Sequence, residues 1–481
     1  MRILAVLAGA LLLAWPAFLN GYPLVFSDTG AFLHQTAPPP SGPLVIWDKP
    51  HIYGPVLHAF HWRVTLWAPL AAQAAMMSWL LWLVQRALRG AAAPWLHLAV
   101  CAAAALLTTA PFTVALLMPD VFAPAVLLAL LLLGFCRDAL TRAETWLVAL
   151  IATLGIAAHL SHLPLAASVV VITLLLTRRL RPALRTALPI LGAVLLLLAT
   201  NWWGHGRAVL SPHGATFALA RLQADGPAAA VIRARCPDSG WYLCAFADRL
   251  PMDSDAFLWS PDSPVNRGPD GTPRFLGGAL LSVEAGAIVA ETLRSRPLEV
   301  AQAMLRNTLA QLGMATAGDT LGDDHLRAAL RPRIAEAFPP RERAAYDAAL
   351  QPRGLLREAV APVLWLHGPV LLLGAALALL AWWRAALRHD LRRLGLVVGL
   401  LVGVTANAFA TGALSKPHLR YEARILWLMP VIAALALLPR AGPREDSRSV
   451  GPAGRPGPAE AANAARAEWR ASQAPGGRAG A

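Results

Sequence analysis

Charge is scarce in this chain. Of its 481 residues, 57% are hydrophobic and only 15% are charged, whereas about a quarter of the residues in soluble domains are charged. Lysine is almost absent, since Lys49 and Lys416 are the only two. Apolar runs long enough to cross a hydrocarbon core recur along the sequence. This composition excludes an ordinary soluble domain and predicts an all-α polytopic membrane protein.

Acidic residues are also in short supply. The 42 lysines and arginines outnumber the 28 aspartates and glutamates, and the formal net charge is +14. Such an excess is typical of nucleic-acid-binding proteins, but many of these arginines lie in short connections between apolar runs. Positive charge in such connections sets the orientation of membrane helices. We therefore reject nucleic-acid binding.

The apolar runs predict ten membrane spans and a division into four parts. The predicted spans cover approximately residues 3–20, 62–85, 94–118, 120–136, 143–159, 163–177, 186–203, 359–383, 393–413 and 423–439. Residues 1–203 then form an N-terminal module of about seven helices, with a first outer loop at 20–61. A large insertion at 204–358 separates it from a C-terminal module of three helices at 359–439. The tail at 440–481 is rich in Ala, Gly, Pro and Arg, which predicts disorder.

Arginine is unequally divided between the two sides of the predicted spans. One set of connections is rich in it, for example at Arg178, Arg179 and Arg181, whereas the alternate connections carry few basic residues. The positive-inside rule therefore predicts that both termini are cytoplasmic. The insertion at 204–358 is then a periplasmic domain of a bacterial inner-membrane protein.

Cysteines are few, and their positions separate them into two kinds. Cys101 and Cys136 lie in apolar spans and are interpreted as small core residues. Cys236 and Cys244 flank a Pro-Asp-Ser-Gly turn in the insertion. In the oxidising periplasm these two are expected to form a disulfide, and two free thiols are the alternative.

The second half of the insertion is predicted to be helical. Pro297 indicates the start of a helix and Gly313 its end. Between them Leu298, Leu305 and Leu309 belong to one apolar stripe. Such a helix could pack against a neighbour or lie along the membrane surface.

Nearly all motif-like polar residues fall at the outer ends of the predicted spans. Asp28 lies just beyond the first span, where the pKa and the partners of a carboxylate can be tuned; capping of a short helix at 29–35 is the alternative. Asp120, at the tip of a helical hairpin, is either functional or the cap of the outgoing helix. His159 and His162 could share one face and bind a metal or a phosphate, but a polar turn is the favoured interpretation.

Positive charge in the last outer loop breaks the positive-inside trend and requires a reason. Arg420 and Arg424 are four residues apart, so on a helix they share one face. With Lys416 and His418 they suit a lipid phosphate or pyrophosphate. Contact with lipid headgroups or with acidic residues of the insertion is the alternative.

These pieces together resemble membrane glycosyltransferases of the GT-C superfamily. The matching stretches are Ser-Asp-Thr-Gly-Ala-Phe-Leu at 27–33 and Asp-Lys-Pro-His-Ile-Tyr at 48–53, together with Asp120, Arg420 and Arg424. Members of that superfamily are polytopic and use sugars carried on polyprenyl phosphate or pyrophosphate. They have an essential acidic residue in the first outer loop. This chain departs from the pattern, because that loop has no adjacent acidic pair and the large outer domain precedes the last three spans.

The resemblance implies an inverting transferase that moves a sugar from a polyprenyl-phosphate-type lipid to an extracytoplasmic glycan, lipid or protein acceptor. Asp28 would be the general base. The expected ligands of the lipid phosphate are Lys416, His418, Arg420 and Arg424. The candidates for binding the acceptor, or a divalent cation, are Asp120, His162 and Asp48. No cofactor is certain, and the identity of any metal is unknown.

Two functions of other classes compete with a transferase. The alternative is a non-enzymatic envelope assembly or export partner that works through the periplasmic insertion. A transporter is disfavoured, because the spans carry few ionisable residues at their centres and the sequence shows no internal repeat. An enzyme should bring Asp28, Arg420 and Arg424 together at one cavity, whereas a scaffold need not.

Overall fold

The computed structural model describes residues 1–38 and 46–441. Met1–Arg440 form one compact unit. Apart from its first two residues, the tail predicted at 440–481 lies outside the described residues. Helices hold 74% of the described residues, and no strand occurs among them. The predicted all-α class is therefore confirmed.

Among the described residues, four helices are long and apolar enough to cross a membrane. They are α5 (Trp67–Arg89), α11 (Leu180–His205), α21 (His367–Leu387) and α22 continued through η6 (Leu391–Ala413). Four shorter apolar helices are α1 (Arg2–Leu13), α6 (Pro94–Leu107), η1 with α8 (Pro119–Phe135) and α10 (His162–Thr177). The two remaining predicted spans contain α9 (Arg142–Ala158) and α24 (Leu428–Leu437). Each predicted span thus contains a helix, while the ten-span topology itself stays a prediction.

Cap residues explain several helix boundaries. α5 ends where Gly90 adopts φ +82°, a left-handed conformation that glycine tolerates. α9 begins with a capping box, in which Glu144 N donates to Thr141 Oγ1 at 3.2 Å and Thr141 N donates to Glu144 Oε2 at 2.9 Å. Pro119 begins the short helix η1 (Pro119–Val121), which leads directly into α8 (Phe122–Phe135). Local sequence therefore fixes where the polar turns between helices lie.

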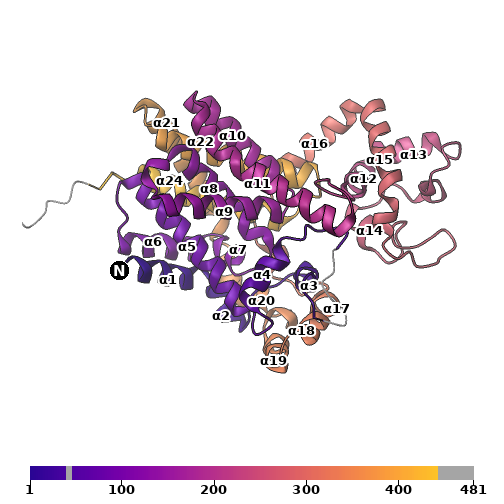
Figure 1. The fold of residues 1–481 in the computed structure, drawn as a ribbon, viewed down its shortest axis with the longest axis horizontal. Coiled ribbons are helices and arrows are strands. Elements are labelled where there is room, and N and C mark those ends of the chain that lie inside the picture. Colours follow the sequence, from indigo (N-terminus) through magenta and orange to yellow (C-terminus); the bar gives the residue numbers. More distant parts are fainter. Residues whose placement is uncertain (39–45, 442–481) are drawn as a thin grey trace, which may run out of the picture. The chain divides into compact units, whose positions relative to one another are not determined.

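The helix α8 lies at the centre of the packing. It is apolar on every face, and all 14 of its residues are buried. It contacts α5, α9, α10, α11 and α22, and Figure 1 shows α8 beside α9, α11 and α22. A Cβ at Gly395 of α22 would lie 2.2 Å from the Phe135 ring, so only glycine permits this approach. Asp120, just before α8, is thus attached to a fully buried helix.

The insertion predicted at 204–358 contributes to two different cores. Its first part has a core of its own, which includes Phe257 and Ile288. The helices of this part are α12 (Gly214–Ala224), α13 (Pro227–Arg235), η3 (Tyr242–Arg249), α14 (Ser254–Trp259) and α15 (Gly277–Ser295). The predicted disulfide between Cys236 and Cys244 is confirmed here. Elsewhere Cys101 and Cys136 are buried free thiols, as interpreted from the sequence.

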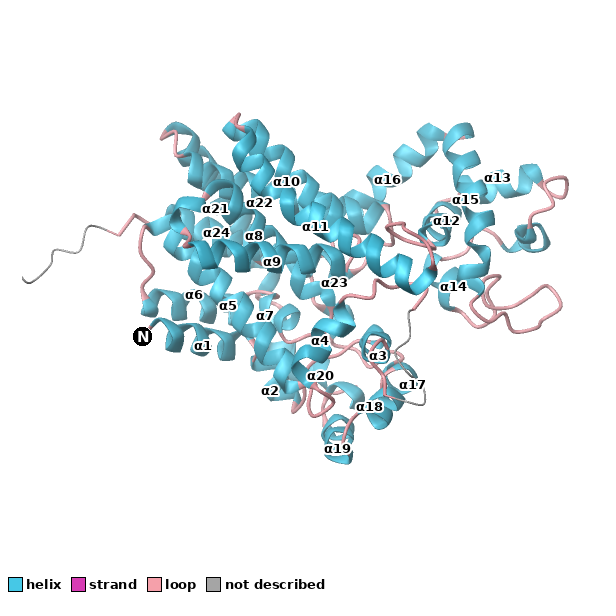
Figure 2. Cartoon of the chain, in the orientation of Figure 1, coloured by secondary structure: helices cyan, strands magenta, loops and turns pink. Residues whose placement is uncertain are grey.

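The second part of the insertion packs against the first outer loop. Its buried residues, Tyr346 among them, belong to the same core as the apolar helices. α17 and α18 contact α3 (Ser27–His34), and Figure 2 shows these three close together. The short helices of this part are η4 (Gly318–Thr320), α17 (Leu326–Ala329), α18 (Arg331–Ala337), α19 (Pro340–Ala348), η5 (Gln351–Arg353) and α20 (Leu356–Leu364). The remaining short elements are α2 (Trp15–Asn20), α4 (Tyr53–His61), α7 (Ala110–Val114), η2 (Arg137–Ala139) and α23 (Leu419–Leu426).

The helix α16 (Pro297–Leu312) begins and ends where the sequence predicts, with Gly313 following it. Its leucine stripe is not the packed face, because Leu298, Leu305 and Leu309 are 76%, 61% and 60% exposed. The opposite face is buried and mixes apolar with polar side chains, namely Val300, Ala303, Asn307, Thr308 and Gln311. Gln311 exchanges two hydrogen bonds with the backbone of His418, at 2.8 and 3.0 Å. The buried face of α16 thus contacts the last outer loop.

Candidate functional site

Four segments far apart in the sequence meet at one end of the apolar helices. They are α3 with Asp28, η1 with Asp120, the turn between α9 and α10 that contains Ser161, and α23 with Arg420 and Arg424. The contacts below join these segments directly or through one further side chain. The sequence predicted that their polar residues lie on one side of a membrane, and the structure brings most of them into one cluster.

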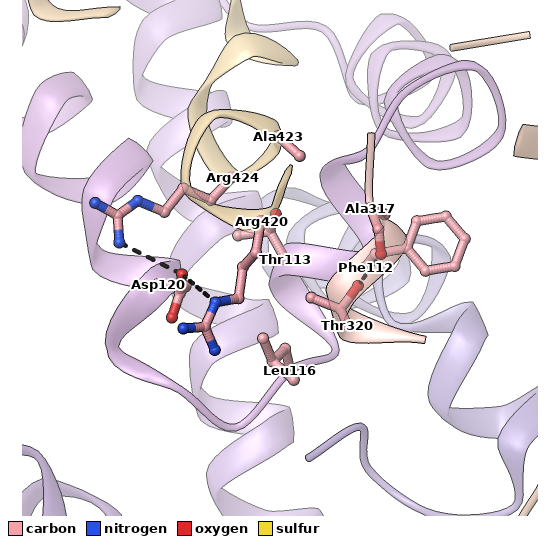
Figure 3. A pocket seen from close by; sticks show the side chains of 9 residues that line it. All are labelled: Phe112, Thr113, Leu116, Asp120, Ala317, Thr320, Arg420, Ala423 and Arg424. Carbon is pink, nitrogen blue, oxygen red and sulfur yellow. Dashed lines mark hydrogen bonds and ion pairs between the residues drawn. The ribbon is translucent and has the colours of Figure 1, made fainter. Parts of the chain in front are cut away.

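Asp120 is held between the two arginines of α23. Arg424 Nη1 lies 3.4 Å and Arg420 Nε 3.7 Å from the same oxygen, Asp120 Oδ1. All three side chains are buried, that of Arg424 to 1% exposure. Figure 3 shows both guanidinium groups beside the Asp120 carboxylate. Asp120 makes no capping hydrogen bond to α8. The interpretation of Asp120 as the cap of the outgoing helix is therefore wrong.

Positive charge exceeds negative charge in the group formed by Asp120, Arg420 and Arg424. Two guanidiniums share one carboxylate oxygen, and the buried nitrogens Arg420 Nε, Arg420 Nη1 and Arg424 Nε have no hydrogen-bond partner among the described residues. Leaving buried donors unpaired is costly. A cavity of about 10 Å³ adjoins them, lined by Asp120, Arg420 and Arg424 among others (Figure 3). That volume holds about one water molecule.

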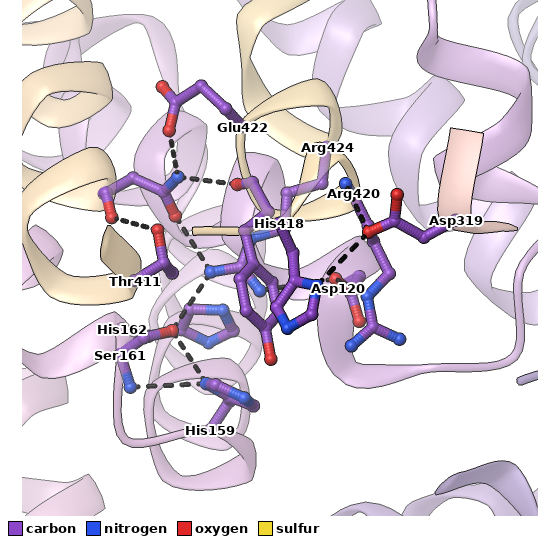
Figure 4. A network of polar contacts seen from close by, with 12 residues as sticks. Asp120, His159, Ser161, His162, Asp319, Thr411, His418, Arg420, Glu422 and Arg424 are labelled. Carbon is purple, nitrogen blue, oxygen red and sulfur yellow. Dashed lines mark hydrogen bonds and ion pairs between the residues drawn. The ribbon is translucent and has the colours of Figure 1, made fainter. Parts of the chain in front are cut away.

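A second layer of hydrogen bonds fixes Arg424. Its Nη2 donates to Ser161 Oγ at 3.0 Å and to Asn407 Oδ1 at 2.9 Å. Ser161 Oγ lies 2.7 Å from His159 Nδ1, and Asn407 Nδ2 donates to Glu422 Oε2 at 2.9 Å. Figure 4 shows this network around Arg424. The π-helical turn η6 (Phe409–Ala413) begins two residues after Asn407, and such turns are frequent at functional sites.

Ser161 and Asn407 were missed by reasoning from the sequence. A signal for Asn407 existed, because it is an amide within an apolar span, and polar groups at such positions are generally functional or paired. Ser161 lay unremarked between the two histidines of the outer turn. His162, in contrast, is fully buried, and its Nδ1 donates to Gly155 O at 2.7 Å. It does not line the cavity beside the arginines.

Arg420 connects the cluster to the first outer loop. Its guanidinium carbon lies 3.9 Å from the centre of the Phe26 ring, and Phe26 immediately precedes α3. Burial lowers the pKa of the Arg420 guanidinium, but its interaction with Asp120 above all outweighs burial and raises it. Asp28 does not line the cavity beside Arg420 and Arg424, so the three side chains do not share one cavity as expected of an enzyme.

Asp28 is the accessible carboxylate of this region, with its side chain 39% exposed. It does not cap α3, because Phe26 occupies the N-cap position and no side chain accepts a capping hydrogen bond there. Lys49 Nζ lies 3.3 Å from Asp28 Oδ1 and 2.5 Å from the buried Asp48 Oδ2. Burial lowers the pKa of Lys49, but Asp28 and Asp48 outweigh it and the pKa is raised. Lys49 therefore stays charged and orients Asp28.

Lys416 and His418 pair with acidic residues other than Asp120, although His418 shares Asp319 with the backbone of Arg420 (Figure 4). Lys416 Nζ is 2.8 Å from both Asp253 Oδ2 and Asp255 Oδ2, and His418 Nε2 is 3.3 Å from Asp255. These aspartates flank the start of α14 in the insertion. The structure thus pairs Lys416 and His418 with acidic residues of the insertion, which was the alternative that the sequence left open. Arg420 and Arg424 remain as the candidate phosphate ligands.

No metal site accompanies these groups in the part of the chain that is described. No three side chains of His, Cys, Asp or Glu converge there as ligands of one ion. Comparison with known proteins found no matching family model, no matching curated protein and no matching solved structure.

Proposed function

We propose that this chain is a membrane glycosyltransferase that moves a sugar from a polyprenyl-phosphate-type lipid to an extracytoplasmic acceptor. One observation carries the proposal: Arg420 and Arg424 are buried, share a single carboxylate oxygen and retain unpaired nitrogens. Such a pair suits a phosphate group. The accessible Asp28 lies in α3, which begins directly after Phe26, and Arg420 contacts the Phe26 ring. Asp28 is therefore the candidate base.

The proposed setting is a bacterial inner membrane. The helices occupy ten spans, both termini are cytoplasmic, and the insertion at 204–358 faces the periplasm. The four long apolar helices and the confirmed disulfide support this arrangement. The arginine cluster and Asp28 then lie at the periplasmic ends of the helices, where a lipid headgroup is accessible.

The chemistry follows from the positions of the charges. An acceptor hydroxyl oxygen attacks the anomeric carbon of the sugar, and the bond from that carbon to the phosphate oxygen breaks. Asp28 takes the hydroxyl proton as general base. Arg420 and Arg424 stabilise the negative charge that develops on the departing lipid phosphate. Attack opposite the leaving group inverts the anomeric configuration.

Asp120 has a different part in this scheme. Its position between the arginines makes it the group that holds them in place before the donor binds. The adjoining cavity is smaller than a phosphate group, since it holds about one water molecule. Donor binding therefore requires α23 and the η1 turn to separate, and Asp120 to give up part of its contact with the arginines.

The test separates binding from transfer. Purified protein in nanodiscs is mixed with a panel of polyprenyl-phosphate sugars, and the wild type is compared with Asp28→Asn. We expect Asp28→Asn to bind the donor like the wild type and to lose about 10²- to 10⁴-fold in transfer, the usual contribution of a general base. Asp248→Asn, at an exposed position in η3, is the matched control and should transfer normally. Full transfer by Asp28→Asn, or no binding of any carrier by the wild type, would overturn the proposal.

A second candidate is a non-enzymatic envelope assembly partner. It is favoured by apolar side chains exposed on the first part of the insertion, with Phe275 at 85%, Val283 at 76% and Leu280 at 62%. This function predicts that the helices outside the insertion have no activity of their own. Donor binding that depends on Arg420 and Arg424 would count against an assembly partner, since this function does not require a buried phosphate site.

A further inference from the structure

An aromatic cluster joins the first outer loop to the insertion close to Asp28. Trp47 stacks on Phe217 of α12, with ring centres 5.5 Å apart and planes 28° apart. Trp259, at the end of α14, lies 6.0 Å from Trp47 and 6.3 Å from Phe217. We call these three rings the Trp259 platform. They come from three segments, so the platform exists only in the folded chain.

The platform is rigid at its base and accessible at Trp259. A Cβ at Gly278 would lie 2.2 Å from the Trp47 ring, so the backbone of α15 touches that ring and holds it. Trp259 is 48% exposed although it packs on two other aromatic rings. Burying an indole fully would stabilise the fold more. An indole that is positioned by packing and left about half exposed is suited to a ligand.

The platform lies beside the proposed catalytic carboxylate. Lys49 Nζ is 5.7 Å from the centre of the Trp259 ring and 3.3 Å from Asp28 Oδ1. Asp28 Oδ1 therefore lies within about 9 Å of the ring centre. One hexopyranose with its hydroxyl groups spans such a distance. An apolar indole face and hydrogen-bonding charged groups are thus within reach of one sugar residue.

The chemistry of these groups selects the class of ligand. One face of a pyranose carries axial C–H bonds, which pack on an aromatic ring, while its hydroxyls bond to carboxylates and ammonium groups. Asp28 and Asp48 face a single Lys49, so the local charge is negative and disfavours an anionic ligand. The apolar chain of a lipid forms no favourable contact with these charged groups. A neutral glycan matches both halves of the surface.

We infer that the Trp259 platform binds a neutral sugar residue of the acceptor, whose hydroxyl then points to Asp28. This inference rests on the proposed function, and it names a glycan among the three acceptor classes that the sequence left open. Arg420 meets the first outer loop at the Phe26 ring, whereas the platform lies beside Lys49, the ion-pair partner of Asp28. Donor and acceptor would therefore approach Asp28 from different directions.

The experiment measures glycan binding without any lipid donor. Saturation-transfer NMR and calorimetry are run on the full chain in nanodiscs with neutral oligosaccharides, namely tetramers of glucose, mannose and N-acetylglucosamine. We expect at least one tetramer to bind, and Trp259→Ala to weaken its binding about tenfold, as expected for loss of an aromatic anchor. Trp259→Phe should restore most of the affinity. Trp95→Ala, at an 83% exposed tryptophan of α6, is the matched control and should bind like the wild type.

The outcomes distinguish this inference from the proposed function. Absence of binding by all three tetramers, or binding that Trp259→Ala leaves unchanged, overturns the glycan site even where the lipid donor binds. Glycan binding that depends on Trp259 but occurs without any transfer supports the site and contradicts the transferase. An intact Cys236–Cys244 disulfide in Trp259→Ala, checked by thiol labelling, shows that the insertion still folds.

Discussion

The two halves of the last outer loop carry similar charge but have opposite surroundings. Lys416 is 28% exposed and contacts two aspartates of the insertion, so its charge is neutralised. Arg424, eight residues later, is 1% exposed and shares one oxygen of Asp120 with Arg420. The sequence alone predicted that these residues belong to one phosphate site. The comparison shows that similar positive charge can be fully neutralised in one half of a loop and only partly neutralised in the other, and this difference is why we propose a phosphate site at the arginines alone.

The largest difference should appear when the acidic partner is removed. Asp120→Ala leaves two buried guanidiniums without a carboxylate, which typically costs about 3–5 kcal/mol. Asp253→Ala leaves Lys416 with Asp255 and partial exposure to water, so we expect a loss of about 1 kcal/mol or less. The measurement is unfolding in detergent with increasing dodecyl sulfate. Equal losses in the two variants would contradict the distinction between the two halves.

The next largest difference between the two halves of the loop should be their effect on ligand affinity. Arg424→Ala removes a charge-assisted contact to phosphate, worth about 1.5–3 kcal/mol, and should weaken binding of a polyprenyl-phosphate sugar by about one to two powers of ten. Lys416→Ala should leave the affinity within about twofold, because its partners are Asp253 and Asp255. Arg424→Lys retains the positive charge and is the control for misfolding as the cause of the lost affinity. Loss of affinity in Lys416→Ala as large as in Arg424→Ala would restore the single phosphate site that the sequence indicated.

Periodicity and composition were sufficient to predict helix content, the start and end of α16, and the disulfide. Each of these depends on neighbouring residues. Pro297 begins α16 and Gly313 follows it, although Gly313 does not adopt the left-handed conformation of a glycine cap, and a turn brought Cys236 and Cys244 together. The packed face of α16 was not predictable in this way, because it contacts a loop more than a hundred residues away.

Contacts between residues distant in sequence also limited what could be predicted of the site. The segments that carry Asp28, Asp120, Arg420 and Arg424 could be singled out from the sequence, since charge at the ends of apolar spans is unusual. Their pairing could not, because the partner of each charge lies elsewhere in the chain. Asp120 and Arg424 are 304 residues apart, and Lys416 and Asp255 are 161 apart. Only the fold determines which carboxylate meets which cation.

The smallest predicted effect is a dependence of the Lys416 contact on pH. Burial raises the pKa of Asp255, but hydrogen bonds from His418 and Lys416 outweigh it and lower the pKa to about 2. An unfolded aspartate titrates at about 3.9. The folded state therefore holds fewer protons between these values, so the contact stabilises fully above about pH 4 and is lost as the pH falls through 2. The contribution should be about 1 kcal/mol or less, because the group is partly exposed and screened by solvent.

Unfolding measured between pH 2 and 5 for the wild type and Lys416→Met tests this dependence. The wild type should be the more stable at the upper end, and the difference should shrink toward zero at the lower end. Added salt should reduce it as well, because screening acts on exposed pairs. The destabilisation caused by Asp120→Ala should change little with salt, since the Asp120 pair is buried. A salt-insensitive Lys416 contact would mean that the insertion shields this half of the loop too, and exposure would no longer explain why the two halves differ.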